Sequence, residues 1–149
     1  MHTGQSMTFF RTYFSALLMF LVLAAVGQQA SAQAPELAIE ATPNTVGAGG
    51  STVLTFTIDN SLRPEATAVG FTMALPASPA QAVVADGFAS TTCSAGTLTA
   101  PSGATSIVFA EGVLDRDTTC TLTVNATLPA AGAYTFPGVS LSSSAGTQP

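Results

Sequence analysis

The amino-acid sequence predicts an all-β fold, a two-sheet β-sandwich of about seven strands. Most of the chain after residue 32 alternates apolar and polar residues, which is the period of strands that bury one face. Clusters of Gly, Pro, Asn and Asp separate these runs and mark turns. No stretch after residue 32 combines a sustained helical period with capping signals, so we expect no helix there. Short alternating strands separated by turns, over roughly 100 residues, are typical of a two-sheet sandwich.

The expected strands follow the alternating runs. Clear runs occupy residues 37–41, 54–58, 69–75, 107–109 and 120–128, a weaker strand or covering loop occupies 83–88, and a last strand occupies 134–141. In the most regular run Cys120, Leu122 and Val124 share one face and threonines occupy the other, which predicts that the Cys120 sulfur points into the core. Pro137 and Gly138 break the phase of the last run, which favours a bulge or an edge position there.

The N-terminal residues have the three zones of a secretory signal peptide. A short zone with one arginine precedes an apolar stretch at residues 13–27, and a polar zone then ends in Ala30-Ser31-Ala32. A membrane-spanning helix needs roughly 20 apolar residues, which is more than this stretch provides. We therefore predict a signal-peptide helix over residues 1–32, cleavage between Ala32 and Gln33, and one domain over residues 33–149.

Removal of this segment leaves an acidic domain. Residues 33–149 contain two Arg, no Lys, no His and eight acidic residues, for a formal charge of −6. With so few cations to neutralise phosphates, we expect no nucleic-acid partner. We also expect no membrane span after cleavage, because no second apolar run is long enough. The predicted location is outside the cytoplasm: periplasmic, cell-surface or extracellular.

Both cysteines, Cys93 and Cys120, lie in the predicted domain. An even cysteine count in a small exported domain favours a disulfide. The alternatives are a metal pair or a nucleophilic thiol. Two cysteines without histidine make a poor metal site, and a catalytic cysteine normally needs histidine as its base. We therefore predict a structural disulfide, with Cys93 reaching Cys120 from a loop or a neighbouring strand.

The sequence offers no candidate catalytic, cofactor-binding or metal site, and we expect no enzyme. No His or Lys is present after residue 32 to activate a Ser or Thr nucleophile. Asp115 and Asp117 flank an arginine and could be a calcium ligand pair, but calcium takes six or more oxygen ligands and no spaced acidic run supplies them. A solvated turn is the favoured interpretation of these two residues.

The order of several motifs resembles that of the bacterial "conserved repeat" domains of unknown function, the group numbered eleven, and their relatives. The matching stretches are residues 50–60 (GSTVLTFTIDN), 71–76 (FTMALP), Cys93 with Gly96, 119–124 (TCTLTV) and 132–134 (GAY), together with Pro43 and Val46-Gly47. Ala74 departs from the polar residue that relatives often carry before Leu-Pro, and the chain holds a single copy of the pattern. The resemblance implies an immunoglobulin-like sandwich in an exported or surface protein, where such modules often occur in tandem.

These observations together predict a non-enzymatic structural or adhesive module of the bacterial cell envelope or exterior. This expectation rests partly on fold analogy. The expected partner is a protein or glycan at the cell surface, with no cofactor. The alternative is a carbohydrate- or protein-ligand-binding module, although carbohydrate sites usually present exposed aromatic rings and this domain has no Trp.

Overall fold

The computed structural model of the protein describes residues 33–148, so the predicted signal peptide and Ala32 lie outside the described residues. The described part of the chain contains eleven β-strands and no helix, in agreement with the predicted all-β class. The strands are β1 (Glu36–Thr42), β2 (Thr45–Val46), β3 (Gly50–Asp59), β4 (Ala66–Ala74), β5 (Val83–Thr91), β6 (Ala95–Thr99), β7 (Ser106–Leu114), β8 (Thr119–Leu128), β9 (Gly132–Ala133), β10 (Leu141–Ser143) and β11 (Gly146–Gln148).

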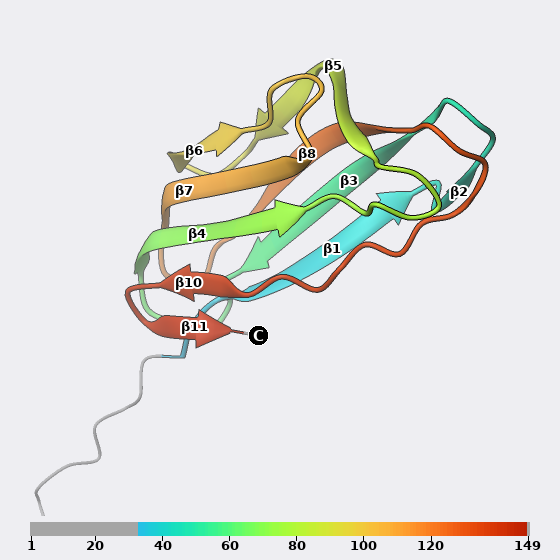
Figure 1. The fold of residues 1–149 in the computed structure, drawn as a ribbon. Coiled ribbons are helices and arrows are strands. Elements are labelled where there is room, and N and C mark those ends of the chain that lie inside the picture. The colour runs from blue at the N-terminus through green and yellow to red at the C-terminus, as the bar shows by residue number, and fades with distance from the viewer. Residues whose placement is uncertain (1–32, 149) are drawn as a thin grey trace, which may run out of the picture. The chain divides into compact units, whose positions relative to one another are not determined.

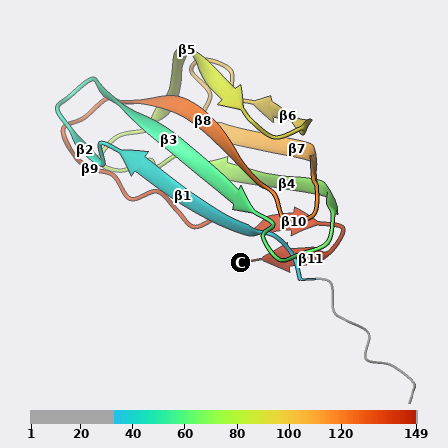
Figure 2. The same ribbon diagram turned by 180° about the vertical axis from the view of Figure 1, so that it is seen from behind.

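The strands form two antiparallel sheets that face each other, which confirms the predicted β-sandwich (Figures 1 and 2). The first sheet has the order β1-β3-β8-β5, and the second has the order β11-β10-β4-β7-β6. A separate two-residue ladder joins β2 to β9. Seven of these strands are five residues or longer, and six of the seven correspond to expected runs.

The central ladder of the first sheet pairs β3 with β8 over ten residues without a break in register. This pairing places Phe56 opposite Leu122 and Leu54 opposite Val124, so the apolar set of each strand faces the same side. All four of these side chains are buried, while the threonines between them face outward. The alternation seen in the sequence therefore generates one face of the core directly.

The second sheet supplies the other face of the core. Phe71 from β4 lies between Phe56 and Phe109, with ring centroids 4.9 Å and 6.1 Å away, respectively. A β-carbon added at Gly96 or Gly112 would lie 2.6 Å from the ring of Phe109, so the absence of side chains at these glycines makes room for it. The three rings thus join the two sheets at the centre of the sandwich.

The connections between the sheets differ from those of an immunoglobulin constant domain. The first sheet has the equivalent of the A-B-E-D strand order. However, β6 and β7 of the second sheet come between β5 and β8 in the chain, whereas strands D and E of that domain follow each other directly. Instead, β3 pairs with β8 and β4 pairs with β7, and β5 and β6 lie on the other sides of β8 and β7, each at an edge of its own sheet.

Two expectations from the sequence need correction. Residues 95–99 form β6, a strand that the alternating runs did not predict. The last strand was expected over 134–141, yet ladder pairing begins only at Leu141, and residues 134–140 run as an extended segment outside both sheets. Pro137 has no N–H to donate, so it could not take part fully in a ladder at that point.

Polar contacts fix the loop between β3 and β4. Asn60 is fully buried, and its amide donates hydrogen bonds to the carbonyl oxygens of Pro64 (2.8 Å) and Asp115 (2.9 Å). The largely buried Arg63 donates to the Asp59 carbonyl oxygen (3.0 Å) and forms an ion pair with Glu36. These contacts join the beginning of β1, the β3–β4 loop and the β7–β8 turn at one end of the sandwich.

Candidate functional site

A disulfide joins Cys93 to Cys120, as predicted from the sequence, with 4.9 Å between the two α-carbons. Cys120 is buried on the core face of β8, as its place in the alternating run indicated. Cys93 is half-buried and lies in the short connection between β5 and β6, where the chain passes from the first sheet to the second. The bond therefore attaches this corner of the fold to the central ladder, which is a structural role.

The candidate calcium ligands have structural partners instead. The Asp117 carboxylate accepts a hydrogen bond from the Leu62 N–H at 2.8 Å, and the Asp115 carbonyl oxygen accepts one from Asn60. Both aspartates are exposed in the turn between β7 and β8, which is the solvated turn expected from the sequence. Across residues 33–148, no three His, Cys, Asp or Glu side chains come together in a way that would hold a metal ion.

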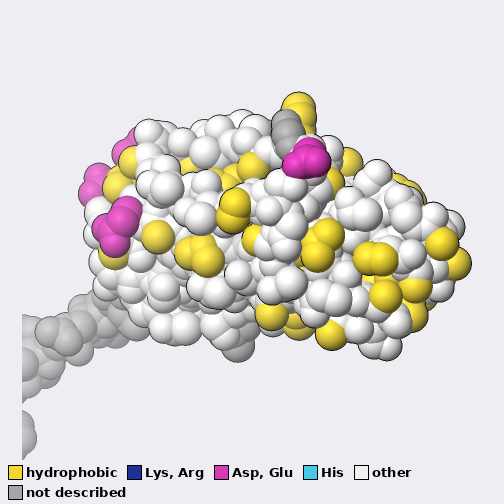
Figure 3. Space-filling view, turned by 45° about the horizontal axis from the view of Figure 1, so that its top comes forward, with side chains coloured by type: hydrophobic (Ala, Val, Ile, Leu, Met, Phe, Trp, Pro, Cys, Tyr) yellow, Lys and Arg dark blue, Asp and Glu magenta, His cyan; other side chains and the backbone are white. Residues whose placement is uncertain are grey.

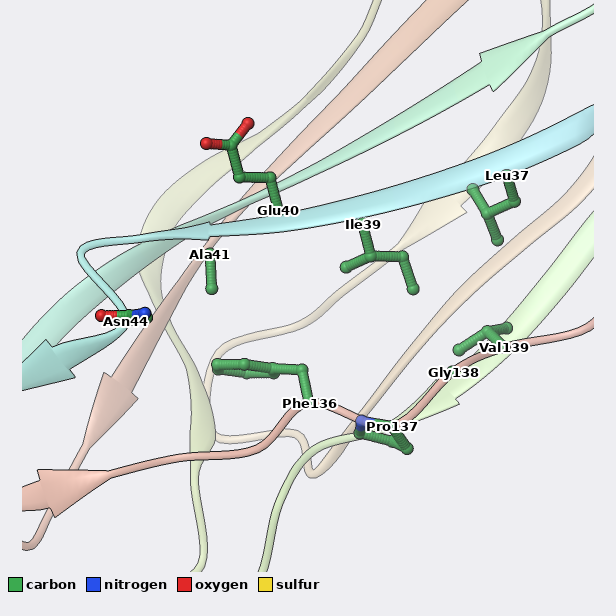
Figure 4. A pocket seen from close by; sticks show the side chains of 9 residues that line it. All are labelled: Leu37, Ile39, Glu40, Ala41, Asn44, Phe136, Pro137, Gly138 and Val139. Atoms are coloured by element: carbon green, nitrogen blue, oxygen red, sulfur yellow. The ribbon is translucent and has the colours of Figure 1, made fainter.

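One concave feature of the described surface is a groove beside β1, lined mainly by apolar side chains, which we call the β1 groove. It has a volume of about 570 Å³ and lies between β1 and the extended segment 134–140. Figure 4 shows Leu37, Ile39 and Ala41 pointing from β1 toward Phe136 and Val139 across the groove. All five side chains are half-buried, so the core does not cover them completely and part of their apolar surface faces the groove beside exposed polar groups.

Both walls of the β1 groove are positioned by the fold. One wall is the inward-facing set of β1, held in unbroken register with β3 from Glu36 to Thr42. The other wall is anchored at its two ends by the buried side chains of Tyr134 and Leu141. The Tyr134 hydroxyl exchanges hydrogen bonds with the backbone of Ala130, accepting from its N–H at 3.1 Å and donating to its carbonyl oxygen at 3.3 Å.

Backbone hydrogen-bonding groups are left free along both walls. β1 is the edge strand of its sheet and pairs with β3 alone. Within the described part of the chain, residues 134–140 make no backbone–backbone hydrogen bond, and residues 36–42 make none outside the ladder with β3. The groove therefore combines apolar side chains with backbone N–H and C=O groups that still need partners.

The residues that line the groove include one acidic residue, Glu40, and no basic residue. Glu40 lies at the rim, and Figure 4 shows its side chain pointing away from the groove interior, on the outer face of the sheet. Figure 3 shows another face of the domain, on which acidic side chains and scattered hydrophobic atoms are visible and no basic side chain is. Of the two arginines in residues 33–148, Arg63 is held by Glu36, and Arg116 lies in the exposed β7–β8 turn.

One carboxyl group at the end of β3 has a perturbed pKa. Hydrogen bonds from Ser61, and more weakly from Thr119, together with the charge of Arg63, hold the pKa of Asp59 below its ordinary value of 3.8. The Ser61 backbone N–H donates to the Asp59 carboxylate at 2.8 Å, and the Thr119 hydroxyl donates at 3.1 Å. This group fixes the loop at the end of the sandwich and does not line the groove.

Part of the groove was foreshadowed by sequence patterns. Pro137 and Gly138 were identified as a break in the last strand, and both residues line the groove. The apolar residues Leu37 and Ile39 were assigned to the core face of a strand, which the structure confirms in part, since both are half-buried. Their position opposite Phe136 depends on which strand forms the sheet edge, and local patterns do not specify that order.

No helix in the described part of the chain is long and apolar enough to cross a membrane. Comparison with curated proteins gives no match. Residues 35–149 match a family model described as "Domain of unknown function (DUF7933)". This match covers the whole sandwich, including both cysteines and both walls of the β1 groove. The chain therefore belongs to the DUF7933 family of domains of unknown function.

Proposed function

We propose that this protein is an exported, non-enzymatic structural or adhesive module of the bacterial cell envelope or exterior, and that it acts by holding another molecule in the β1 groove. The observation that carries the proposal is the groove itself. Its walls are apolar and its backbone edges are unpaired, a combination suited to binding a polymer or a polypeptide.

Two further observations support an exported setting. The Cys93–Cys120 disulfide is typical of proteins that leave the reducing cytoplasm. The N-terminal sequence has the three zones of a signal peptide, with Ala30-Ser31-Ala32 before the start of the folded domain. The resemblance to the conserved repeat modules of group eleven points to the same setting. The strand order of the first sheet, which matches A-B-E-D of an immunoglobulin domain, is the feature that supports an immunoglobulin-like relationship within this proposal.

Export is tested by expressing the 149-residue chain in a bacterial host, fractionating the cells and sequencing the N-terminus of the product. We expect a protein that begins at Gln33 in the periplasmic or extracellular fraction. An intact terminus at Met1, or at Met7, which could also serve as the start of a complete signal peptide, in the membrane fraction would contradict the export proposal. A panel of hydrolase substrates applied to the same product should show no turnover, and activity lost on substitution of a single carboxylate would contradict the non-enzymatic role.

A carbohydrate-binding module is the second candidate function, and the position of Phe136 is the observation that favours it. Its half-buried ring lines the groove, where it could stack against a sugar. A glycan array with the exported protein separates the two candidates. Specific glycan binding that is lost in Phe136→Ala but retained in Phe88→Ala, which removes an exposed ring away from the groove, would favour the carbohydrate role.

A further inference from the structure

The four sheet edges of the sandwich are not equally protected. β5 and β6 both carry register shifts in their ladders, between Val84 and Ala89 and between Ala95 and Thr97. Such irregularities disrupt an edge and hinder pairing with another chain. β11 has only three residues, and short edge strands are another common protection. These three edges therefore have features that discourage strand addition.

The β1 edge lacks these protections. It has seven residues in unbroken register with β3, and its sequence Glu36–Thr42 contains neither Pro nor Lys. An exposed, regular edge of this length is a template for an additional strand. Beside it, the β1 groove provides space for the side chains of such a strand, because Leu37, Ile39 and Ala41 all face the groove and remain only half-buried.

The two faces of β1 specify the side chains of an added strand. Side chains of the new strand that face the core side would enter the groove, against Leu37, Ile39 and Phe136, and should be apolar. A residue on the outer face would lie beside Glu40, which is exposed and points outward. Opposite charges in neighbouring strands attract and like charges repel, so that residue should be Lys or Arg.

Charge also indicates whether the added strand comes from a second copy of this chain. Residues 33–149 have a formal charge of −6, so two copies repel each other. Neither arginine of this chain is suited to the position beside Glu40 of a second copy, because Arg63 is buried in its ion pair and Arg116 lies in a turn. A basic, alternating strand must therefore belong to a different polypeptide.

From these observations we propose that the β1 edge binds an extended segment of another protein by strand addition, with apolar residues at alternate positions in the groove and a Lys or Arg beside Glu40. Backbone hydrogen bonds to β1 give the affinity, and the groove and Glu40 select the sequence. This inference rests on the binding role proposed above and names the partner chemistry of the same site. The export test does not depend on strand addition. A failure of the export proposal can therefore be distinguished from a failure of the strand-addition proposal.

The probe is a blocked seven-residue peptide with valine at every odd position, threonine at the second and sixth positions, and lysine at the fourth. Isotope-labelled exported protein is titrated with this peptide, and backbone amide shifts are followed by NMR. We expect saturable shifts at residues 37–41 and 136–139. Two variants of the peptide, one N-methylated at the valines and the other at the threonines and the lysine, each lack the hydrogen-bond donors of one edge. The variant whose missing donors face β1 should bind about tenfold more weakly or worse.

Charge reversal provides the matched control. A peptide with glutamate in place of lysine should bind the native protein about 2- to 30-fold more weakly, since an attraction becomes a repulsion. Glu40→Lys should invert this preference. Glu65→Lys makes the same change in net charge on an exposed residue of the β3–β4 loop, away from the groove, and should leave the preference unchanged.

Three results would overturn the proposal. The first is the absence of shifts at residues 37–41 at saturating concentrations of the lysine peptide. The second is binding of both N-methylated peptides as tight as that of the unmodified peptide, because backbone pairing would then play no part. The third is self-association of the peptide-free protein through the same amides, detected by light scattering and NMR, which would identify a second copy as the occupant.

Discussion

Replacement of both cysteines by alanine should destabilise the protein without changing its fold. The disulfide closes a loop with a sequence separation of 27 residues, which corresponds to about 3.5 kcal/mol in the chain-entropy description. Loss of the buried Cys120 sulfur from the core adds a smaller term. We therefore expect the free energy of unfolding of the Cys93→Ala, Cys120→Ala double variant to fall by about 3–5 kcal/mol.

The assay is equilibrium unfolding in urea, followed by circular dichroism, on the exported protein and the double variant. A loss of this size corresponds to a midpoint lower by about 2 M. Reductant provides an internal control, because it should lower the midpoint of the native protein to that of the double variant and leave the double variant unchanged. Two reactive thiols in the unreduced native protein would refute the bridge. A double variant within about 1 kcal/mol of the oxidised native protein would refute its structural role.

Three other substitutions test the account of the fold. Asn60→Ala should cost roughly 1–3 kcal/mol in chemical denaturation, because two carbonyl oxygens lose the buried amide that donates to them. Gly112→Ala should cost roughly 1–3 kcal/mol, since its β-carbon would lie 2.6 Å from the Phe109 ring, whereas Gly47→Ala, with nothing within 4 Å, should be nearly neutral. The pKa of Asp59 is lowered in the folded protein, so its carboxylate stabilises the fold above its ordinary pKa and that contribution is lost as the pH falls through the lowered value. Asp59→Asn should therefore reduce the loss of stability measured by urea unfolding between about pH 5 and pH 2, and an unchanged acid profile would contradict this assignment.

Alternation in the sequence was sufficient to predict the central strands. Leu54, Phe56 and Ile58 are buried in β3, and Leu122 and Val124 are buried in β8, because a period of two residues places them on one face of a strand. The same reasoning placed the Cys120 sulfur toward the core, which the structure confirms. These predictions succeeded because the pattern is local and one side of each strand is solvated.

Features that depend on tertiary pairing were missed. β6 has a weak pattern of its own and forms a strand because β7 lies beside it, with Gly96 close to the Phe109 ring. The segment 134–140 looked like a strand because Tyr134, Phe136 and Val139 are apolar, yet no neighbouring strand pairs with it. The β1 groove exists because residues 134–140 stay outside both sheets and β1 is an edge strand, and no local pattern reports an edge.

Intermolecular nuclear Overhauser effects between the exported protein and the lysine peptide test the central claim most directly. If the groove holds an added strand, the peptide valines should show contacts with Leu37, Ile39 and Phe136, and its lysine should lie next to Glu40. Contacts with the threonine-rich outer face of β8 alone, or no contacts at saturating peptide, would contradict the assignment of the β1 groove as the binding site.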